Sequence, residues 1–373
     1  MKELKKLLKG KKYLTIKKEL EKKSEVDIAE ILEPFDVHTT LLMFRMLPKD
    51  VAVGVFSRFS SDQQRDIIGL ITDEELREIL DELFFDDMID MIEEMPANIV
   101  KKILFHTKKE ERGLINQFLK YPQDSAGSIM TIEYVSLKKG MTVKEAMMHI
   151  KDVGLNRETV YTCYVMDENR RLEGIVSLRK LVISEDNEVV EDIMNRDVIY
   201  VYTHDDQETV AAIFKRYGFL ALPVVDKEDR LTGIITFDDI MGVIDQENTE
   251  DLQKMAAMSP TEEKYLDIGI FTLAKHRILW LLILMISATF TGGIIRRYEE
   301  VLGTVIILAA FIPMLMDTGG NAGSQSSTLV IRGLALGEIK LRDVWKVIWK
   351  EFRVSLVVGV VLSSANFLRL YFI

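Results

Sequence analysis

Apolar residues recur at helical spacing through the first third of the chain. Ile28, Ile31 and Leu32 begin one such pattern, with steps of three and one, as on the buried face of an amphipathic helix. Thr72 followed by Glu75 forms a capping box, in which the two side chains bond free backbone N–H groups at a helix start. The pattern predicts a series of short amphipathic helices over residues 24–127.

A short motif occurs twice in this helical region. Residues 46–51 read Met-Leu-Pro-Lys-Asp-Val, and residues 94–99 read Glu-Met-Pro-Ala-Asn-Ile. In each copy the proline stands where a helix would start, a position that tolerates proline. A repeat of this length indicates a superhelix of stacked short helices, although the motif has only two copies.

A longer repeat follows, over residues 128–191 and 192–249. Each copy opens on Ile-Met, contains an apolar strand that ends at Asp, and continues through a turn into a strand centred on glycine. That glycine is Gly174 in the first copy and Gly233 in the second, and a helix start follows each strand. The repeat predicts a tandem pair of α/β units.

The polarity of the chain changes after residue 277. Residues 278–295 and 301–316 carry no charge, and residues 354–373 are apolar apart from Asn366 and Arg369. A membrane-spanning helix needs about 20 mostly apolar residues. We therefore predict spanning helices at about 277–296, 299–317 and 353–373.

Two further helices are predicted around these spans. Residues 252–275 have apolar positions at helical spacing, which predicts one long connecting helix within residues 250–276. Residues 341–350 place Trp345, Trp349 and aliphatic side chains beside basic ones, a composition typical of an amphipathic helix in the membrane interface.

The stretch from Pro313 to Ser326 interrupts the second apolar run with glycines and small polar residues. Inside hydrocarbon, a break in the backbone is tolerated only where it lines water or is buried in protein. A carboxylate and an amide at that depth indicate an ion or substrate path. The alternative is a loop just outside the bilayer, with the Gly-Gly pair ending the helix.

Charge divides the chain more sharply than its total of −11 suggests. The first 23 residues hold ten lysines against three glutamates, whereas residues 24–277 carry −21. That acidic segment argues against nucleic acid as a partner, and bound cations would relieve its self-repulsion. The lysine-rich start could bind anionic lipid through Leu4, Leu7 and Leu8, or it could be a solvated helix.

The compartment follows from similar arguments. A single cysteine, Cys163, excludes a disulfide framework and fits a reducing environment. The start lacks an apolar signal segment, and six basic residues fall within 317–353 against two in the preceding turn. The bias of positive charge places the later loop inside, so we expect residues 1–276 to be cytoplasmic. The histidines are scattered and show no zinc spacing, and the sequence contains no glycine-rich phosphate loop. These observations give no sign of an enzyme.

In order, these segments resemble the MgtE family of magnesium channels and transporters. The resemblance covers the whole length and is most specific in Pro-x-Leu-x-x-x-Gly-Gly-Asn-x-Gly-x-Gln, from Pro313 to Gln325. It implies a multidomain membrane protein with an all-α superhelical N domain, an α/β tandem CBS pair, a long connecting (plug) helix and an α-helical transmembrane domain. The expected boundaries are 1–23 for the lysine-rich segment, 24–127 for the N domain, 128–191 and 192–249 for the two CBS domains, 250–276 for the connecting helix and 277–373 for a partial transmembrane domain.

The resemblance implies a homodimeric, Mg²⁺-gated Mg²⁺ channel that intracellular Mg²⁺ closes. Seven acids match family positions for regulatory Mg²⁺: Asp86, Asp90, Asp206, Glu208, Glu247, Glu250 and Asp251. Two positions that can be acidic in relatives are Gly218 and Gly242 here, which puts one or more of these sites in doubt. Asp206 and Glu208 also suit a first helical turn for reasons of the helix dipole alone.

The ion pathway implied by the family would use oxygen ligands, which Mg²⁺ prefers. Asp317, Asn321 and the freed carbonyls near Gly319 and Gly320 would supply them, although Asn321 could instead join two helices by hydrogen bonding. The family has five membrane helices with an acid on the fifth, and this chain ends at Ile373 in the third, so we expect an incomplete chain. The alternatives are a membrane-anchored CBS regulator that senses nucleotides, or a transporter of Co²⁺ or Mn²⁺, which oxygen ligands do not distinguish from Mg²⁺.

A nucleotide site is implied only in part. Arg179 and Phe219 occupy positions where relatives contact adenine nucleotide, so ATP is a possible ligand. Thr162 stands where an aromatic side chain could stack, and Lys180 replaces an acid that could hold the ribose hydroxyls.

Overall fold

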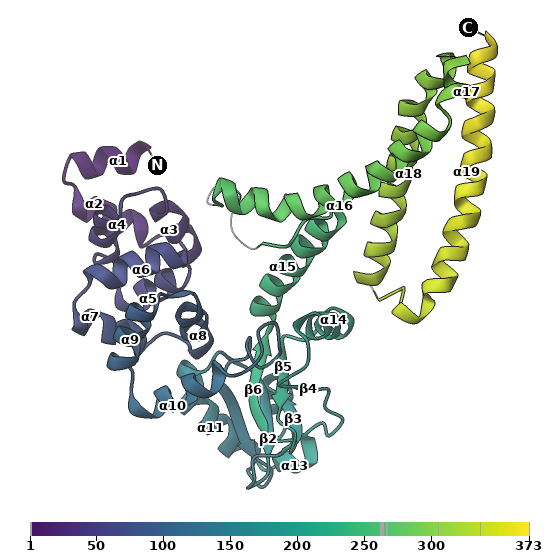
Figure 1. The fold of residues 1–373 in the computed structure, drawn as a ribbon. Helices are drawn as coiled ribbons and strands as arrows, with labels where there is room; N and C mark the ends of the chain where they lie inside the picture. Colours follow the sequence, from purple (N-terminus) through teal and green to yellow (C-terminus); the bar gives the residue numbers. More distant parts are fainter. Residues whose placement is uncertain (1, 262–264, 266–267, 305, 336, 373) are drawn as a thin grey trace. The chain divides into compact units, whose positions relative to one another are not determined.

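The structure, a computed structural model, describes residues 2–261, 265, 268–304, 306–335 and 337–372 (Figure 1). It divides into two units, Met1–Val243 and Ile244–Ile373, which are described separately.

Short helices fill the first part of the first unit, as the sequence predicted. They are α1 (Lys2–Lys9), α2 (Tyr13–Leu20), α3 (Glu25–Leu32), α4 (Val37–Phe44), α5 (Lys49–Ser57), α6 (Ser61–Leu70), α7 (Asp73–Leu80), α8 (Phe85–Glu94), α9 (Ala97–His106) and α10 (Lys109–Phe118). From α3 to α9, helices two apart along the chain contact each other: α3 with α5, α4 with α6, α6 with α8 and α7 with α9. This stacking is the superhelix that the short repeat indicated.

The helix starts are specified locally. Thr72 and Glu75 form the expected capping box, with Thr72 N–H donating to Glu75 Oε2 at 2.8 Å and Glu75 N–H donating to Thr72 Oγ1 at 3.2 Å. Pro48 and Pro96 occupy the N-cap positions of α5 and α9, where the missing N–H costs no helical hydrogen bond.

The α/β repeat forms two sheets of the same topology. The first contains β1 (Tyr134–Lys138), β2 (Thr159–Met166) and β3 (Leu172–Ser177), and the second contains β4 (Val201–Tyr202), β5 (Ala221–Val225) and β6 (Leu231–Thr236). In each, the first two strands are parallel and the last two antiparallel. The helices are α11 (Val143–Val153), η1 (Gly154–Asn156), α12 (Leu178–Ile183), α13 (Val190–Ile193), α14 (Gln207–Tyr217) and α15 (Phe237–Met255).

The two copies are interlocked, which the sequence did not predict. The segment that opens the first copy pairs with the second sheet, since Thr131 bridges Ile234, and Asn195 of the second copy bridges Ile175 of the first. The central glycines permit this approach: a Cβ atom on Gly233 would lie 2.6 Å from the Thr131 carbonyl oxygen.

The second unit differs from the sequence prediction at the connecting helix. Helix α15 ends at Met255, and Ala257 has a positive φ of 54°, a left-handed conformation that ends the helix. Helix α16 then runs from Ile270 to Arg297. The predicted single helix over 250–276 is therefore wrong, and part of that range lies outside the described residues.

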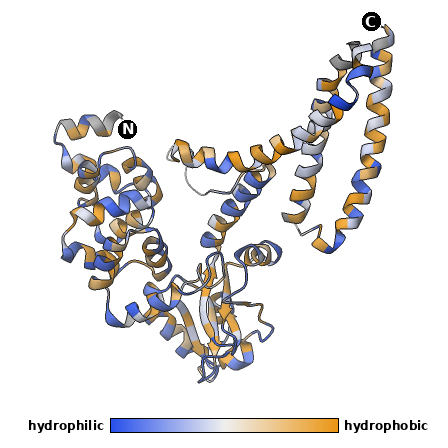
Figure 2. Ribbon diagram, in the orientation of Figure 1, coloured by the Kyte–Doolittle hydropathy of each residue, from blue (hydrophilic) through white to orange (hydrophobic). Residues whose placement is uncertain are grey.

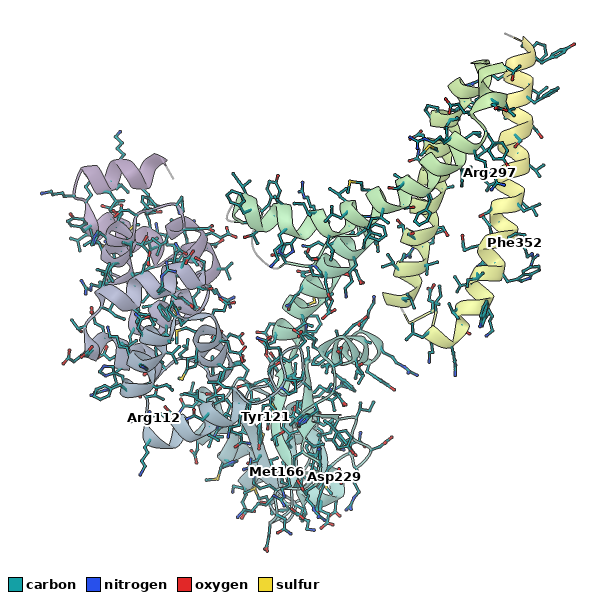
Figure 3. All side chains as sticks on the ribbon, viewed as in Figure 1. Arg112, Tyr121, Met166, Asp229, Arg297 and Phe352 are labelled. Atoms are coloured by element: carbon teal, nitrogen blue, oxygen red, sulfur yellow. The ribbon has the colours of Figure 1, made fainter. Side chains whose placement is uncertain are left out.

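The apolar segments form long helices (Figure 2). After α16 come α17 (Glu299–Thr304), α18 (Ile306–Ala335), η2 (Leu341–Asp343) and α19 (Val344–Phe372). Within the described residues, Ile270–Arg297 and Leu341–Arg369 are long and apolar enough to cross a membrane, by length and composition alone. Many of their side chains project outward, as Phe352 does at 56% exposed (Figure 3).

Two local predictions in this unit are wrong. Helix α18 continues without a break through Pro313, Gly319 and Gly320 to Ala335, so the expected loop or unwound segment is absent there. A glycine inside a helix costs only about 1 kcal/mol, which a long apolar helix tolerates. Residues 344–350 are the first turns of α19 rather than a separate interface helix.

Candidate functional site

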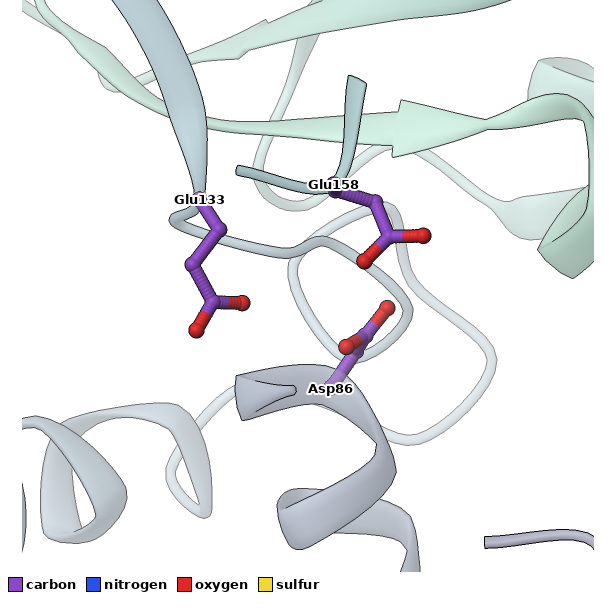
Figure 4. Close-up of side chains that lie close together, drawn as sticks. All are labelled: Asp86, Glu133 and Glu158. Carbon is purple, nitrogen blue, oxygen red and sulfur yellow. The ribbon is translucent and has the colours of Figure 1, made fainter. Parts of the chain in front are cut away.

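Three carboxylates meet in the first unit. Asp86 lies in the first turn of α8, Glu133 directly precedes β1 and Glu158 directly precedes β2. One oxygen from each lies within 4.8 Å of the other two (Figure 4). We refer to Asp86, Glu133 and Glu158 as the acidic triad.

Local folding brings the two glutamates together. Strands β1 and β2 are parallel neighbours with Tyr134 opposite Thr159, so the residues that precede them lie at the same edge of the sheet. The Glu158 N–H donates to the Glu133 carbonyl oxygen at 2.9 Å. Helix α8 joins this edge through Phe85, whose N–H donates to Glu133 Oε2 at 3.0 Å.

The hydrogen bonding of the acidic triad is incomplete. Glu133 Oε2 accepts from Phe85 N–H and from the Thr131 hydroxyl, at 3.0 and 2.9 Å. In contrast, Asp86 Oδ1 and Glu158 Oε2 are buried and have no hydrogen-bond partner in the described part of the chain. A buried oxygen that could accept a bond and makes none is costly, so these two atoms are available to a ligand.

Burial and mutual repulsion disfavour the charged forms of these acids. Burial, then the charges of Asp239, Glu158 and Asp87, raises the pKa of Asp86 to about 9. Burial, then Asp239, raises the pKa of Glu158 to about 7. The pKa of Glu133 is also raised by burial, against the lowering effect of its hydrogen bonds.

Acids next to the acidic triad also have raised pKa values. Burial and repulsion from Asp239 raise the pKa of Asp87 to about 6 and that of Asp90 to about 7. Burial also raises the pKa of Asp239. Asp90 is exposed, so solvent weakens the repulsion there.

The acidic triad suits a hard divalent cation. Mg²⁺ binds oxygen at about 2.1 Å and Ca²⁺ at about 2.3–2.6 Å, so opposite ligand oxygens lie about 4–5 Å apart. Oxygens within 4.8 Å of one another fall in this range with small side-chain adjustments. The remaining positions around Mg²⁺ would be filled by water, which it releases reluctantly.

A second candidate site is a cleft between the two copies of the α/β repeat, with a volume of about 570 Å³. It is lined by Arg179 and Phe219, as predicted, and also by Thr162. The Phe219 ring stacks on Tyr217 with centroids 5.4 Å apart. Lys180 does not line the cleft in the described residues, and its N–H donates instead to Ser177 Oγ at 3.2 Å.

Comparisons with known proteins agree with this organisation. Family models match residues 23–124 (MgtE intracellular N domain), 126–184 and 190–246 (CBS domain) and 312–373 (divalent cation transporter). The magnesium transporter MgtE of Thermus thermophilus is 37% identical over 328 residues, which cover 86% of this chain and 72% of that protein. The chain belongs to the MgtE family.

Other members give the same result. The magnesium transporter MgtE of Bacillus subtilis is 32% identical over 90% of this chain and 76% of its own length. The solved cytosolic domain of the Mg²⁺ channel MgtE in complex with ATP is 34% identical, with a TM-score of 0.61, and aligns to 64% of this chain and 98% of its own. MgtE proteins are transporters or channels, in agreement with the expectation that the chain is not an enzyme.

Among the acids predicted for this MgtE chain, Asp86 lies in the acidic triad and Asp90 lies one turn further along α8. Asp206 and Glu208 are exposed, and Asp206 caps α14 by accepting from Glu208 N–H at 2.9 Å. This contact is the structural role that a first helical turn suggested. Gly218 ends the same helix with a φ of 66°, a conformation that favours glycine.

The remaining predicted acids lie in the second unit. Glu247, Glu250 and Asp251 are on α15, where Glu250 pairs with Lys254 at 2.6 Å. Gly242 lies inside α15 before them.

The predicted pathway residues lie in the middle of α18. Asn321 Nδ2 donates to Asp317 Oδ2 at 3.4 Å, one helical turn apart. Gly319 and Gly320 are within the helix, so their carbonyls are not freed by unwinding as expected.

Sequence reasoning missed Glu133, Glu158, Asp87 and Asp239. Each glutamate directly precedes a strand, but the repeat predicted only the strand after Glu158, and β1 was not predicted. Their closeness depends on β1 and β2 being parallel neighbours, which the sequence did not state.

Proposed function

We propose that the chain transports Mg²⁺ across the cytoplasmic membrane as a homodimer, with residues 1–276 in the cytoplasm. Membership of the MgtE family and the names of its relatives support transport of Mg²⁺. Two long apolar helices support placement in a membrane.

We infer further that intracellular Mg²⁺ closes the pathway by binding the acidic triad. The observation that carries this proposal is the pair of buried, unpartnered oxygens, Asp86 Oδ1 and Glu158 Oε2, from different parts of the unit. Without a cation, the acids repel unless they hold protons. When Mg²⁺ is bound, all three carboxylates are attracted to the same ion, which joins α8 to the edge of the β1–β2 sheet.

Along α18 we propose Asp317 and Asn321 as oxygen ligands of the transported ion, supported by their hydrogen bond on one helical face. Gly320, three positions after Asp317, then leaves that face open, because no neighbouring described atom lies within 4 Å of a Cβ built on it. Gly319 lies two positions after Asp317, on another face of the helix, and remains a proposed pathway residue on the family resemblance alone. The acids Asp206, Glu208, Glu247, Glu250 and Asp251 remain proposed regulatory ligands on the family resemblance alone.

ATP in the cleft is a second, separate proposal. Arg179 would bind the phosphates and Phe219 would stack on the adenine ring, since both residues line the cleft. The relative solved with ATP supports nucleotide binding in this family.

Transport is tested by Mg²⁺ uptake into vesicles that carry the protein. We expect Asp317→Asn and Asn321→Ala to reduce uptake several-fold, while the matched changes Asp343→Asn and Asn366→Ala leave it within twofold. Wild-type uptake in both pathway variants would remove these residues from the pathway. No uptake of any divalent ion by the wild type would favour the membrane-anchored regulator, and uptake of Co²⁺ or Mn²⁺ alone would change the substrate.

Regulation is tested by protease digestion of the same protein with EDTA or millimolar Mg²⁺. We expect Mg²⁺ to slow cleavage within residues 24–243 in the wild type, and Glu158→Gln to weaken this protection. Glu168→Gln, an exposed change of the same kind, is the control. Equal cleavage rates with and without Mg²⁺ would contradict the proposal.

A further inference from the structure

The lysine-rich start of the chain presents an unusual concentration of free positive charge. Seven lysines are exposed on the described surface of residues 2–23: Lys6, Lys11, Lys12, Lys17, Lys18, Lys22 and Lys23. Only two of them form ion pairs among the described residues, Lys17 with Glu21 at 3.8 Å and Lys22 with Glu19 at 2.8 Å. The other five form no ion pair there, and of these Lys23 acts on a neighbouring acid by lowering the pKa of Glu19, so most of their charge is available to an outside anion.

The apolar residues of this segment are used differently from the sequence expectation. Leu4 is buried at 9% exposed, and Leu7 and Leu8 are half-buried, so the leucines of α1 are largely withdrawn from solvent. In α2, Ile16 and Leu20 are fully buried, whereas Leu14 is 80% exposed. The segment is therefore held to the protein by its apolar face and offers lysines with one exposed leucine on the outside.

We propose that residues 2–23 form a docking surface for the anionic lipid headgroups of the membrane that holds the chain. Lysines beside an exposed apolar side chain are typical of segments that bind anionic membrane surfaces. Charge and proximity both favour anionic lipid as the partner. Residues 24–277 carry −21 and would be repelled by such a surface, so the +7 of residues 1–23 is the part of the cytoplasmic region that it attracts.

This proposal rests on the cytoplasmic placement in the proposed function. Docking brings the end of the helical superhelix to the bilayer, because Ile16 and Leu20 anchor α2. Attraction to lipid is electrostatic, so it weakens with salt. Five unpaired lysines are enough to change the fraction bound by about tenfold or more, since each adds its own attraction near an anionic surface.

The full chain in vesicles provides the test. Thr15, exposed on α2 beside Leu14, is changed to cysteine and labelled with an environment-sensitive fluorophore. Native Cys163 is fully buried, which favours labelling at residue 15. Emission is compared in phosphatidylcholine and in phosphatidylcholine with phosphatidylglycerol, and a spin-labelled headgroup lipid serves as quencher.

We expect a blue shift and quenching only with phosphatidylglycerol, both reversed by high salt. Changing Lys6, Lys11, Lys12, Lys18 and Lys23 to Gln should abolish the response. The matched control changes five other exposed, unpaired lysines to Gln, namely Lys101, Lys109, Lys120, Lys144 and Lys227, and should keep it.

Three results would overturn the proposal. They are the same emission in both kinds of vesicle, an equal loss of the response in the control variant, or a lysine-dependent response in vesicles that contain only phosphatidylcholine. The last result would identify an acidic protein surface as the partner. Uptake of Mg²⁺ is measured on the same vesicles. Docking without uptake would refute the transport proposal alone, whereas uptake without docking would refute this one alone.

Discussion

At the scale of single residues, protons and divalent cations compete for the acidic triad. Burial and like charges raise the pKa of Asp86 to about 9 and that of Glu158 to about 7, well above the ordinary values for carboxyl groups. Near neutral pH the folded protein without cations therefore holds protons that an unfolded chain would release. A bound cation replaces these protons, so metal affinity must rise with pH.

The sign of the pH dependence follows from these shifts. Because the folded-state pKa values are raised, the stabilising contribution of the protons is fully present below about pH 4. It is lost as pH rises through the folded values of about 7 and 9. We expect the difference in melting temperature between Mg²⁺ and EDTA to grow from acidic to mildly alkaline pH. The variant Asp86→Asn/Glu158→Gln should show a smaller growth, and a difference that shrinks with pH would contradict the assignment.

Arg157 brings a positive charge close enough to act on the acidic triad. Its Nε is buried without a hydrogen-bond partner in the described residues, and its charge lowers the pKa of Glu133. We expect Arg157→Gln to tighten Mg²⁺ binding at alkaline pH by about threefold to tenfold, because a positive charge near the cation is removed. Calorimetric titration measures this change. The exposed Lys151→Gln is the control, and weaker binding in Arg157→Gln would show that the arginine supports the site.

The sequence predicted residues of this site only in part. Asp86 and Asp90 were predicted because they match acidic positions of the MgtE family. Glu133 and Glu158 are 25 positions apart, and only the parallel pairing of β1 with β2 brings them together. A contact of this kind depends on which strands are neighbours, and hydrophobic patterning does not specify that.

At the scale of elements, the short helices of the first unit are stabilised by packing and, in α3, α4, α6 and α7, by side-chain caps. Each is only eight to ten residues long between α1 and α10, and helices of this length are marginal without capping and packing. The sequence predicted them well because apolar spacing and capping residues are both local signals. It predicted α18 wrongly because glycine and proline inside an apolar helix read as a break, while a long helix tolerates them.

The capping box at Thr72 is the clearest case. We expect Thr72→Ala to lower the free energy of unfolding by about 1 kcal/mol, because the Glu75 N–H loses its acceptor. Thr72→Ser keeps the hydroxyl and should change it little. Denaturant unfolding in EDTA measures both variants. An equal loss in both would show that the threonine methyl group, rather than the cap, matters.

Two polar contacts join α18 and α19 in the part of the chain that the structure describes. The Ser326 hydroxyl donates to Glu351 Oε2, and Arg369 Nη2 donates to Met314 Sδ at 3.5 Å. Hydrogen bonds between membrane helices contribute about 0.5–2 kcal/mol. We expect Ser326→Ala and Glu351→Ala each to lower stability in detergent by an amount in that range, and the double variant to lose less than the sum. Glu338→Ala, in the turn between the helices, is the control. Additive losses would indicate that the two side chains act independently.

At the scale of the whole molecule, the sequence predicted the order of domains but not their interlocking. Family resemblance and hydropathy located the helical, CBS and apolar parts, which the family models also match. The exchange of opening segments between the CBS copies, through Thr131 and Asn195, was not predicted. Each opening segment is short and its pairing is long-range, so no periodic pattern marks it.

The proposed function links the acidic triad to transport, and this link can be measured directly. Mg²⁺ efflux from vesicles is followed while the Mg²⁺ concentration on the cytoplasmic side is varied. We expect wild-type flux to fall as that concentration rises, because Mg²⁺ joins α8 to the β1–β2 edge and stabilises the closed state. In Asp86→Asn/Glu158→Gln the concentration needed for half-closure should rise several-fold, with little change in the maximal flux. Na⁺ at matched ionic strength should not close the wild type, since a monovalent ion at the triad compensates less charge. If the variant closes at the wild-type concentration, the acidic triad is not the regulatory site, and the acids on α15 become the next to test.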